Sequence, residues 1–426
     1  MPTVFTFSFW LLLLTYGYLL RRLVWRIPKP SPGRWLASGI LVLSLGAGVS
    51  VLFFGDAKSI PSLEPASWWQ WSHIWKWMTH ISLGFAYVLF GLVVARDVYW
   101  GLRQLWQGRI GSPDKQAESE ESQPQADLER RRFLLCASNI GLSGISAVAT
   151  GYGFHSARRL QVFEASVPIP GLPDELVGFT IAQIADLHVG QTIGRDFVQS
   201  VVDTVNELSC DLVAFTGDAV NGYLPHMRLR SPPHIRYHLA PLEELRGIHG
   251  CYFVTGNHEY YCGAEAWTEE MERLGFTVLL NDHRLLERGG ARIVLAGVTD
   301  YHGWRYVPSH ASSPRDALAN APDGDIRILL AHQPRSVFEA SEAGCDLQLS
   351  GHTHGGQVFP GHLYVWLKQP YVSGLHRYKN TWIYVSRGTG YVGPVLRLGA
   401  SAEITRITLC REDRAARPTL ASRGAP

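Results

Sequence analysis

Four long apolar runs occupy the first part of the chain. They cover residues 1–20, 35–55, 77–95 and 133–154 and contain no Asp, Glu, Lys or Arg. Each approaches the ~20 residues that an α-helix needs to cross the hydrocarbon core of a bilayer, and Trp and Tyr near their ends suit the membrane–water interface. One such run would also fit a buried soluble helix or a signal peptide, but four in succession predict four transmembrane helices.

Two polar stretches are expected to be disordered, one between the third and fourth apolar runs and one after residue 410. Residues 111–129 are rich in Ser, Gln, Glu and Pro, a composition that cannot bury enough apolar surface to become ordered. We therefore expect residues 111–132 to form a disordered polar linker between three helices in residues 1–110 and the fourth helix at 133–154. Residues 411–426 are likewise expected to form a disordered tail.

The pattern changes near residue 178, where short apolar runs begin to alternate with amphipathic stretches. This alternation is typical of an α/β domain with buried strands, which we place at residues 175–410. Strands are predicted at residues 179–185, 212–216, 252–255, 293–297, 326–331, 347–350 and 383–386. Helices are predicted at residues 195–208, 239–246, 264–274 and 335–343.

Basic residues are unevenly divided among the loops between the apolar runs. The first loop carries Arg21, Arg22, Arg26, Lys29 and Arg34, whereas the second carries only Lys58 and Lys76. Because Lys and Arg are retained on the cytoplasmic side, a multi-pass protein of the cytoplasmic membrane is predicted, with its C-terminal domain on the periplasmic or extracellular side. The run Arg130–Arg132 also resembles a twin-arginine export signal, and simple anchoring explains it equally well.

Cysteine spacing and net charge do not point to two common classes of function. The six cysteines show no CxxC spacing, so a zinc-finger site is not indicated. The formal net charge of +2 gives no indication of nucleic-acid binding. Membrane lipids and a phosphorylated substrate, discussed below, are the partners we expect.

Polar clusters follow five of the predicted strands. They are Asp186-Leu-His188, Gly217-Asp218, Gly256-Asn257-His258-Glu259, His332, and Gly351-His352-Thr-His354. Ligands of α/β sheets gather at the carboxyl ends of strands, and the glycines permit tight turns there. A lone Asp or His after a strand is more often a cap or a core group, but five clusters predict a shared site.

The order DxH, GD, GNHE, His and GHTH resembles the calcineurin-like metallophosphoesterases. The text around these motifs, FVTGNHEYY, LSGHTHGGQ and YVSRGTG, is similar to the bacterial YkuE/YaeI-like branch of that superfamily. The resemblance covers roughly residues 175–410. It implies a four-layer αββα sandwich that holds two metal ions at the strand ends.

The resemblance also implies a role for each matching residue. One metal would be held by Asp186, His188 and His354, the other by Asn257, His332 and His352, and Asp218 would bridge both. His258 would donate a proton to the leaving group or stabilise its charge. Imidazole and carboxylate ligands favour Mn, Fe, Zn, Co or Ni and do not distinguish among these divalent ions.

The implied reaction is hydrolysis of a phosphodiester, phosphomonoester or pyrophosphate by a metal-bridging hydroxide. An apolar, aromatic stretch at residues 358–376 suits either contact with the membrane or ordinary core packing, so an envelope lipid or polyprenyl phosphate is an attractive substrate. A cytoplasm-facing pyrophosphatase of UDP-lipid precursors and a catalytically silent metal-binding sensor stay open. Secondary candidates near the site are Asn221, Glu259, Tyr260, Tyr261, Gln357 and Arg387.

Overall fold

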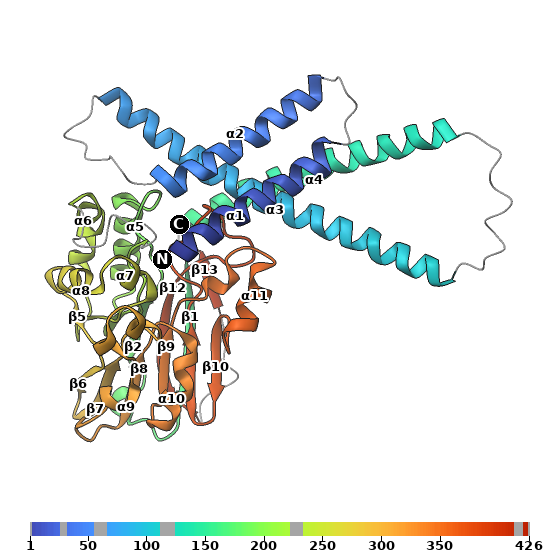
Figure 1. The fold of residues 1–426 in the computed structure, drawn as a ribbon. Helices are drawn as coiled ribbons and strands as arrows, with labels where there is room; N and C mark the ends of the chain where they lie inside the picture. Colours follow the sequence, from blue (N-terminus) through green and yellow to red (C-terminus); the bar gives the residue numbers. More distant parts are fainter. Residues whose placement is uncertain are drawn as a thin grey trace. The chain divides into compact units, whose positions relative to one another are not determined.

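The computed structural model describes residues 2–25, 32–54, 66–110, 124–221, 233–412 and 421–424. The chain divides into two compact units (Figure 1). The N-terminal unit comprises Met1–Ala57 and Pro65–Tyr152, and the C-terminal unit comprises Lys58–Glu64 and Gly153–Pro426.

The N-terminal unit is helical, and each predicted apolar run lies on a helix. Its helices are α1 (Pro2–Leu19), the short π-helix η1 (Leu20–Val24), α2 (Pro32–Phe54), α3 (Ala66–Ile110) and most of α4 (Pro124–Arg158). Tyr16, Leu19 and Leu89 are among the side chains buried in its core. Within the described residues, Ile74–Gln107 and Arg132–Arg158 are long and apolar enough to cross a membrane.

Helix α4 begins earlier than the sequence predicted. Residues 111–123 of the predicted linker lie outside the described residues, but residues 124–132 form the first turns of α4 and are not a disordered linker. The segment is rich in Ala, Leu, Glu and Arg, which are strong helix formers. A helix can therefore continue beyond its apolar part.

The C-terminal unit contains two β-sheets (Figure 1). The first has the order β13 (Ala421–Gly424), β1 (Leu160–Ile169), β12 (Ala402–Arg411), β2 (Thr180–Ile184), β3 (Leu212–Phe215), β4 (Cys251–Phe253), β5 (Thr277–Val278). The second has the order β10 (Gly374–Tyr378), β11 (Thr381–Val385), β9 (Leu347–Ser350), β8 (Ile326–Leu330), β7 (Ala291–Gly297), β6 (Asp282–Arg288). Strands β2 to β5 are mutually parallel, as are β7, β8, β9 and β11.

The two sheets enclose one hydrophobic core. Buried side chains of the first sheet, such as Ile181 and Leu212, belong to the same cluster as Leu295, Ile328 and Leu349 of the second. The fold is thus an α/β sandwich.

The helices and short 3-10 turns of this unit connect its strands. They are η3 (Asp174–Leu176), α5 (Arg195–Glu207), α6 (Pro233–Leu239), η4 (Ala240–Glu244), α7 (Asn257–Cys262), α8 (Ala264–Arg273), η5 (Gly303–Arg305), η6 (Pro308–His310), α9 (Pro314–Ala317), η7 (Pro334–Ser336), α10 (Val337–Glu342), η8 (His354–Gly356) and α11 (Gly361–Lys368).

All seven predicted strands are present, as β2, β3, β4, β7, β8, β9 and β11, and the predicted helices at 195–208, 264–274 and 335–343 match α5, α8 and α10. The segment 239–246 instead forms the 3-10 turn η4.

The boundaries predicted for this domain were too narrow at both ends. Strand β1 precedes residue 175 and pairs in parallel with β12 along its whole length, from Leu160–Ala402 to Ile169–Arg411. Residues 421–424 of the predicted tail form β13, which pairs with β1. An edge strand pairs with its neighbour through main-chain groups only, so the composition of residues 421–424 did not indicate a strand.

Candidate metal centre

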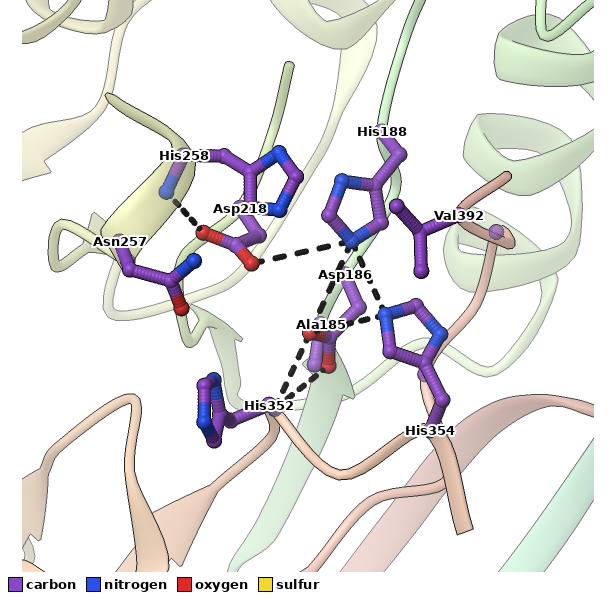
Figure 2. A network of polar contacts seen from close by, with 12 residues as sticks. Ala185, Asp186, His188, Asp218, Asn257, His258, His352, His354 and Val392 are labelled. Atoms are coloured by element: carbon purple, nitrogen blue, oxygen red, sulfur yellow. Dashed lines mark hydrogen bonds and ion pairs between the residues drawn. The ribbon is translucent and has the colours of Figure 1, made fainter. Parts of the chain in front are cut away.

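The predicted site residues meet at the carboxyl ends of strands from both sheets. Asp186 and Asp218 follow β2 and β3 in the first sheet, and His332 and His352 follow β8 and β9 in the second. Asn257 opens α7 directly after β4. Figure 2 shows the side chains of Asp186, Asp218, Asn257 and His352 converging on one another.

One group of ligand-type atoms forms around Asp186. His188 Nε2 lies 3.0 Å from His354 Nε2 and 4.0 Å from Asp186 Oδ1. His354 Nε2 is 3.5 Å from the same carboxylate oxygen. These three side chains could hold one metal ion, and they are the three that the sequence motifs assigned to the first metal.

A second group forms around His332. Its Nε2 lies 3.2 Å from Asn257 Oδ1 and 3.2 Å from His352 Nδ1. Asp218 Oδ2 is 3.2 Å from this nitrogen and 3.7 Å from His188 Nε2 in the first group (Figure 2). Asp218 therefore lies between the two groups, where a bridging carboxylate is expected.

The ligand-type atoms of the second group suit a bound cation. His332 Nδ1 lies 2.8 Å from the Thr216 carbonyl, which can only accept, so Nδ1 donates. In the neutral ring Nε2 then presents a lone pair, and it faces the side-chain oxygen of Asn257 and a ring nitrogen of His352. Acceptor atoms that face one another in a buried space match a divalent ion.

Burial sets the charge states of the other imidazoles. It lowers the pKa of His188 and of His354 well below the usual value, and together with His332 it lowers the pKa of His352 to about 3. These rings are neutral near pH ~7, as metal ligation requires. Burial alone would also lower the pKa of His332, but the carboxylate of Asp218 outweighs it and holds that pKa well above its usual range.

Five of the predicted site residues have a left-handed backbone. They are Asp186 (φ 53°), His188 (φ 51°), Asp218 (φ 57°), His352 (φ 72°) and His354 (φ 50°). Residues other than glycine adopt this region rarely, and such strain gathers at functional sites. The turns that aim these side chains inward are therefore held by the surrounding fold.

Two glycines allow the loops to approach each other. A Cβ atom on Gly256 would overlap the carboxylate and the main-chain nitrogen of Asp218, and one on Gly351 would overlap Asp186. Neither position has positive φ, so the requirement is for space. The GNHE and GHTH loops can lie against the two carboxylates only because these side chains are absent.

His258 lies beside the two groups. Its main-chain N–H donates to Asp218 Oδ1 at 2.8 Å, and its ring meets the edge of the His188 ring at a centroid separation of 4.4 Å (Figure 2). The ring is buried, which lowers its pKa. His258 is thus placed at the metal centre, as expected for a group that contacts substrate.

Glu259 has a structural role that the sequence did not reveal. Its carboxylate accepts from the main-chain N–H groups of Gly256 (2.7 Å), Asp218 (3.0 Å) and Ala219 (2.8 Å). It therefore joins the GNHE loop to the GD loop.

The remaining secondary candidates mostly stabilise loops. Gln357 pairs with the main chain of Val392 through both side-chain atoms, and the Arg387 guanidinium lies over the Phe163 ring. Tyr260 donates or accepts a hydrogen bond at His310, whereas the Tyr261 ring stacks at a tilt on His258. The main-chain N–H of Asn221, beyond Asp218, donates to Val189.

Sequence reasoning missed two buried charged residues at the site. Arg397 is fully buried, donates to the carbonyls of Gly388 and Gly390, and places Nη2 3.3 Å from His354 Nδ1; burial lowers its pKa to about 10. Asp300, beyond the end of β7, accepts from Gln333 next to His332. Asp300 could have been predicted, because it follows strand β7 as the other site residues follow their strands. No sequence motif identifies Arg397.

Comparison with known proteins places this centre in a family. The family model for calcineurin-like phosphoesterases matches residues 179–356. A protein of Helicobacter pylori called an uncharacterized metallophosphoesterase is 37% identical over 266 residues, which cover 62% of this chain and 68% of that protein. The chain belongs to the calcineurin-like metallophosphoesterases.

Relatives within the metallophosphoesterases include proteins named for a membrane location. The transmembrane protein with metallophosphoesterase domain of Danio rerio is 37% identical over 275 residues, covering 62% of this chain and 61% of that protein. The uncharacterized metallophosphoesterase YkuE of Bacillus subtilis is 30% identical over 306 residues, covering 66% of this chain and 98% of that protein. The chain thus spans about three fifths of the length of the zebrafish relative.

Proposed function

We propose that this protein is a membrane-anchored, metal-dependent phosphoesterase that uses two divalent ions to hydrolyse a phosphate ester. The observation that carries the proposal is the pair of buried ligand groups that share Asp218. The carboxylate oxygen of Asp218 lies 3.2 Å from His332 and 3.7 Å from His188, between the two groups, which is where a carboxylate shared by two ions would lie.

The two groups divide the ligands as the motifs suggest. Asp186, His188 and His354 would hold one ion, and Asn257, His332 and His352 the other. When bound, the ions supply Lewis-acid activation of a water molecule and neutralise phosphate charge. The chain's own contribution is to fix the carboxylate of Asp218 between them.

Within this proposal His258 acts on the leaving group. Its main chain is fixed by the hydrogen bond to Asp218, so its ring is held at the edge of the site. Burial favours the neutral ring, which can still donate its N–H hydrogen bond to the oxygen of the departing alcohol. We assign it the stabilisation of that oxygen.

The anchor is proposed to consist of four transmembrane helices with the C-terminal unit outside. Helices α1, α2, α3 and α4 coincide with the four apolar runs, and the segments after the first and third runs carry more Lys and Arg than the segment after the second, which has only Lys58 and Lys76. Asp97, two residues beyond the third apolar run, accepts from Tyr18 and forms ion pairs with Arg22 and Arg96, so this acidic group is matched by two cations. Placement outside favours an envelope lipid or polyprenyl phosphate as substrate.

The first experiment tests catalysis with the full chain purified in nanodiscs. Removal of metal by a chelator should abolish hydrolysis of bis-p-nitrophenyl phosphate, a soluble phosphodiester, or of p-nitrophenyl phosphate, and added Mn²⁺ or Zn²⁺ should restore it. Asp218→Asn should stay inactive, whereas Asp203→Asn, at an exposed position of α5, should match the unsubstituted chain. Metal binding without hydrolysis of either ester would instead favour a silent metal-binding sensor.

A second experiment determines the side of the membrane. A C-terminal reporter enzyme active only outside is compared with a reporter that fluoresces only inside. Activity of the first supports envelope phosphates as substrates. Fluorescence of the second would refute the proposed orientation and favour a cytoplasmic pyrophosphatase of UDP-lipid precursors.

A further inference from the structure

Helix α11 exposes an unusually apolar surface. It has no buried residue, and the segment from Phe359 to Leu367 carries five large apolar side chains that are 53–73% exposed, namely Phe359, Leu363, Tyr364, Trp366 and Leu367. Soluble surfaces rarely collect so many apolar side chains in one place without a binding role. We call these five residues the α11 face.

The α11 face adjoins the candidate metal centre. The helix starts seven residues after His354 and packs against η8, the turn that contains His354. The backbone of His362 lies so close to Gly356 that any side chain on Gly356 would overlap it. Whatever covers the α11 face therefore lies next to the turn that carries His354.

The same face is connected to the point at which the chain enters the C-terminal unit. Phe359 N–H donates to the Leu398 carbonyl, and Arg397 N–H donates to the Gly153 carbonyl. Gly153 also packs on the side chains of Leu396 and Leu398. Gly153 is part of the apolar helix Arg132–Arg158, which is long and apolar enough to cross a membrane, so residues 396–398 contact both the end of this helix and Phe359.

Charge around the α11 face favours an anionic surface. No Asp or Glu occurs from residue 347 to residue 402. Lys368 ends α11 with its ammonium over the Tyr364 ring, and Arg335 hydrogen-bonds to the Lys368 carbonyl. These two cations line a hollow of about 420 Å³ together with Leu367 and Phe338, as expected of a site for a phosphate headgroup beside acyl chains.

We propose that the α11 face lies in the interface of an anionic lipid bilayer and presents the metal centre to phosphate esters whose lipid part stays in that bilayer. Trp and Tyr favour the level of the headgroups, while Leu and Phe enter the acyl boundary. A second copy of this chain would meet the same cations on both sides, which opposes self-association through this face. The statement about substrate delivery rests on the proposed phosphoesterase function, whereas the bilayer contact does not.

The bilayer contact is tested by photo-crosslinking in the full chain. p-Benzoylphenylalanine is placed at Leu363 in nanodiscs that contain phosphatidylglycerol, and at Ile248 as a matched control. Ile248 is 76% exposed and precedes β4, at the end of that strand opposite the metal centre. Lipid adducts detected by mass spectrometry should be at least about tenfold more abundant at position 363; equal yields, or an adduct with another protein chain, would overturn the proposal.

Substrate delivery is tested with the variant Leu363→Asp/Trp366→Asp. Its hydrolysis of soluble bis-p-nitrophenyl phosphate should stay within about twofold of the unsubstituted chain, while hydrolysis of a polyprenyl phosphate in the nanodisc should fall about tenfold or more. Equal hydrolysis of the polyprenyl phosphate by both proteins would refute delivery by α11. If the unsubstituted chain cleaves neither ester, the phosphoesterase proposal fails, and the crosslinking result still decides the bilayer contact.

Discussion

Replacement of Gly256 by Ala isolates the position of Asp218 as a determinant of activity. The new Cβ would lie 2.2 Å from Asp218 Oδ1 and 2.6 Å from the Asp218 nitrogen, whereas ordinary contacts begin near 3.4 Å. The carboxylate must therefore move by about 1.2 Å (3.4 minus 2.2) and the GD loop main chain by about 0.8 Å (3.4 minus 2.6). No ligand is removed, and φ of −98° at Gly256 is accessible to Ala, so the effect is purely steric.

The expected magnitude follows from this displacement. Overpacking of a filled site costs about 1–3 kcal/mol of folding free energy, and misplacement of catalytic groups by ~1 Å lowers turnover by about 10²-fold. We expect Gly256→Ala to lose about 10²-fold in kcat/KM for bis-p-nitrophenyl phosphate, with weaker metal binding measured by elemental analysis after dialysis.

Gly194→Ala is the matched control. Its Cβ would meet only the His238 ring, at an ordinary 3.6 Å, and its φ of −109° is also accessible to Ala. As an N-cap change in α5 it should cost about 1 kcal/mol or less and leave turnover unchanged. Full metal content with near-normal turnover in Gly256→Ala would refute the view that the fixed position of Asp218 matters.

Three further predictions concern the metal ligands and their neighbour. His258→Gln should retain both metals by elemental analysis yet lose about 10²- to 10⁴-fold in turnover; retained turnover would remove His258 from the reaction. Asp218→Asn should lose metal as well as activity, and a variant with full metal content would contradict its bridging role. In the metal-free protein the raised pKa of His332 means that metal must displace a proton, so Mn²⁺ affinity should increase from mildly acidic to mildly alkaline pH. Calorimetry in buffers of different ionisation enthalpy should detect that proton, and its absence would show that His332 is already neutral.

Much of the fold was accessible from local pattern, because central parallel strands are short, apolar and followed by glycine or polar residues. Strands β2, β3, β8 and β9 were found for this reason. Strand β1 was not predicted, although its sequence LQVFEASVPI is β-prone. Its assignment depends on pairing with β12, more than 200 residues away, which no local pattern contains.

The site shows the same division between local and long-range information. Motif order indicated which side chains would converge, since each lies one to four residues beyond a strand. The contributions of Glu259 and Arg397 were not visible, because both act on main-chain groups brought near only by folding. General rules place charged side chains at the surface, so a buried arginine behind His354 has no signature in composition or spacing.

The left-handed backbone at five site residues implies a compromise between the stability of the fold and the placement of the metal ligands. Glycine or asparagine would occupy those turns with less backbone strain, whereas an ordinary side chain there costs about 1–2 kcal/mol per residue. Asp and His nevertheless occupy all five positions, so part of the stability available to this fold is given up for ligand placement. Selection of the chain for heat resistance alone would therefore be expected to enrich Gly and Asn at Asp186, His188, Asp218, His352 and His354, and such a selection would locate the active centre without any measurement of activity.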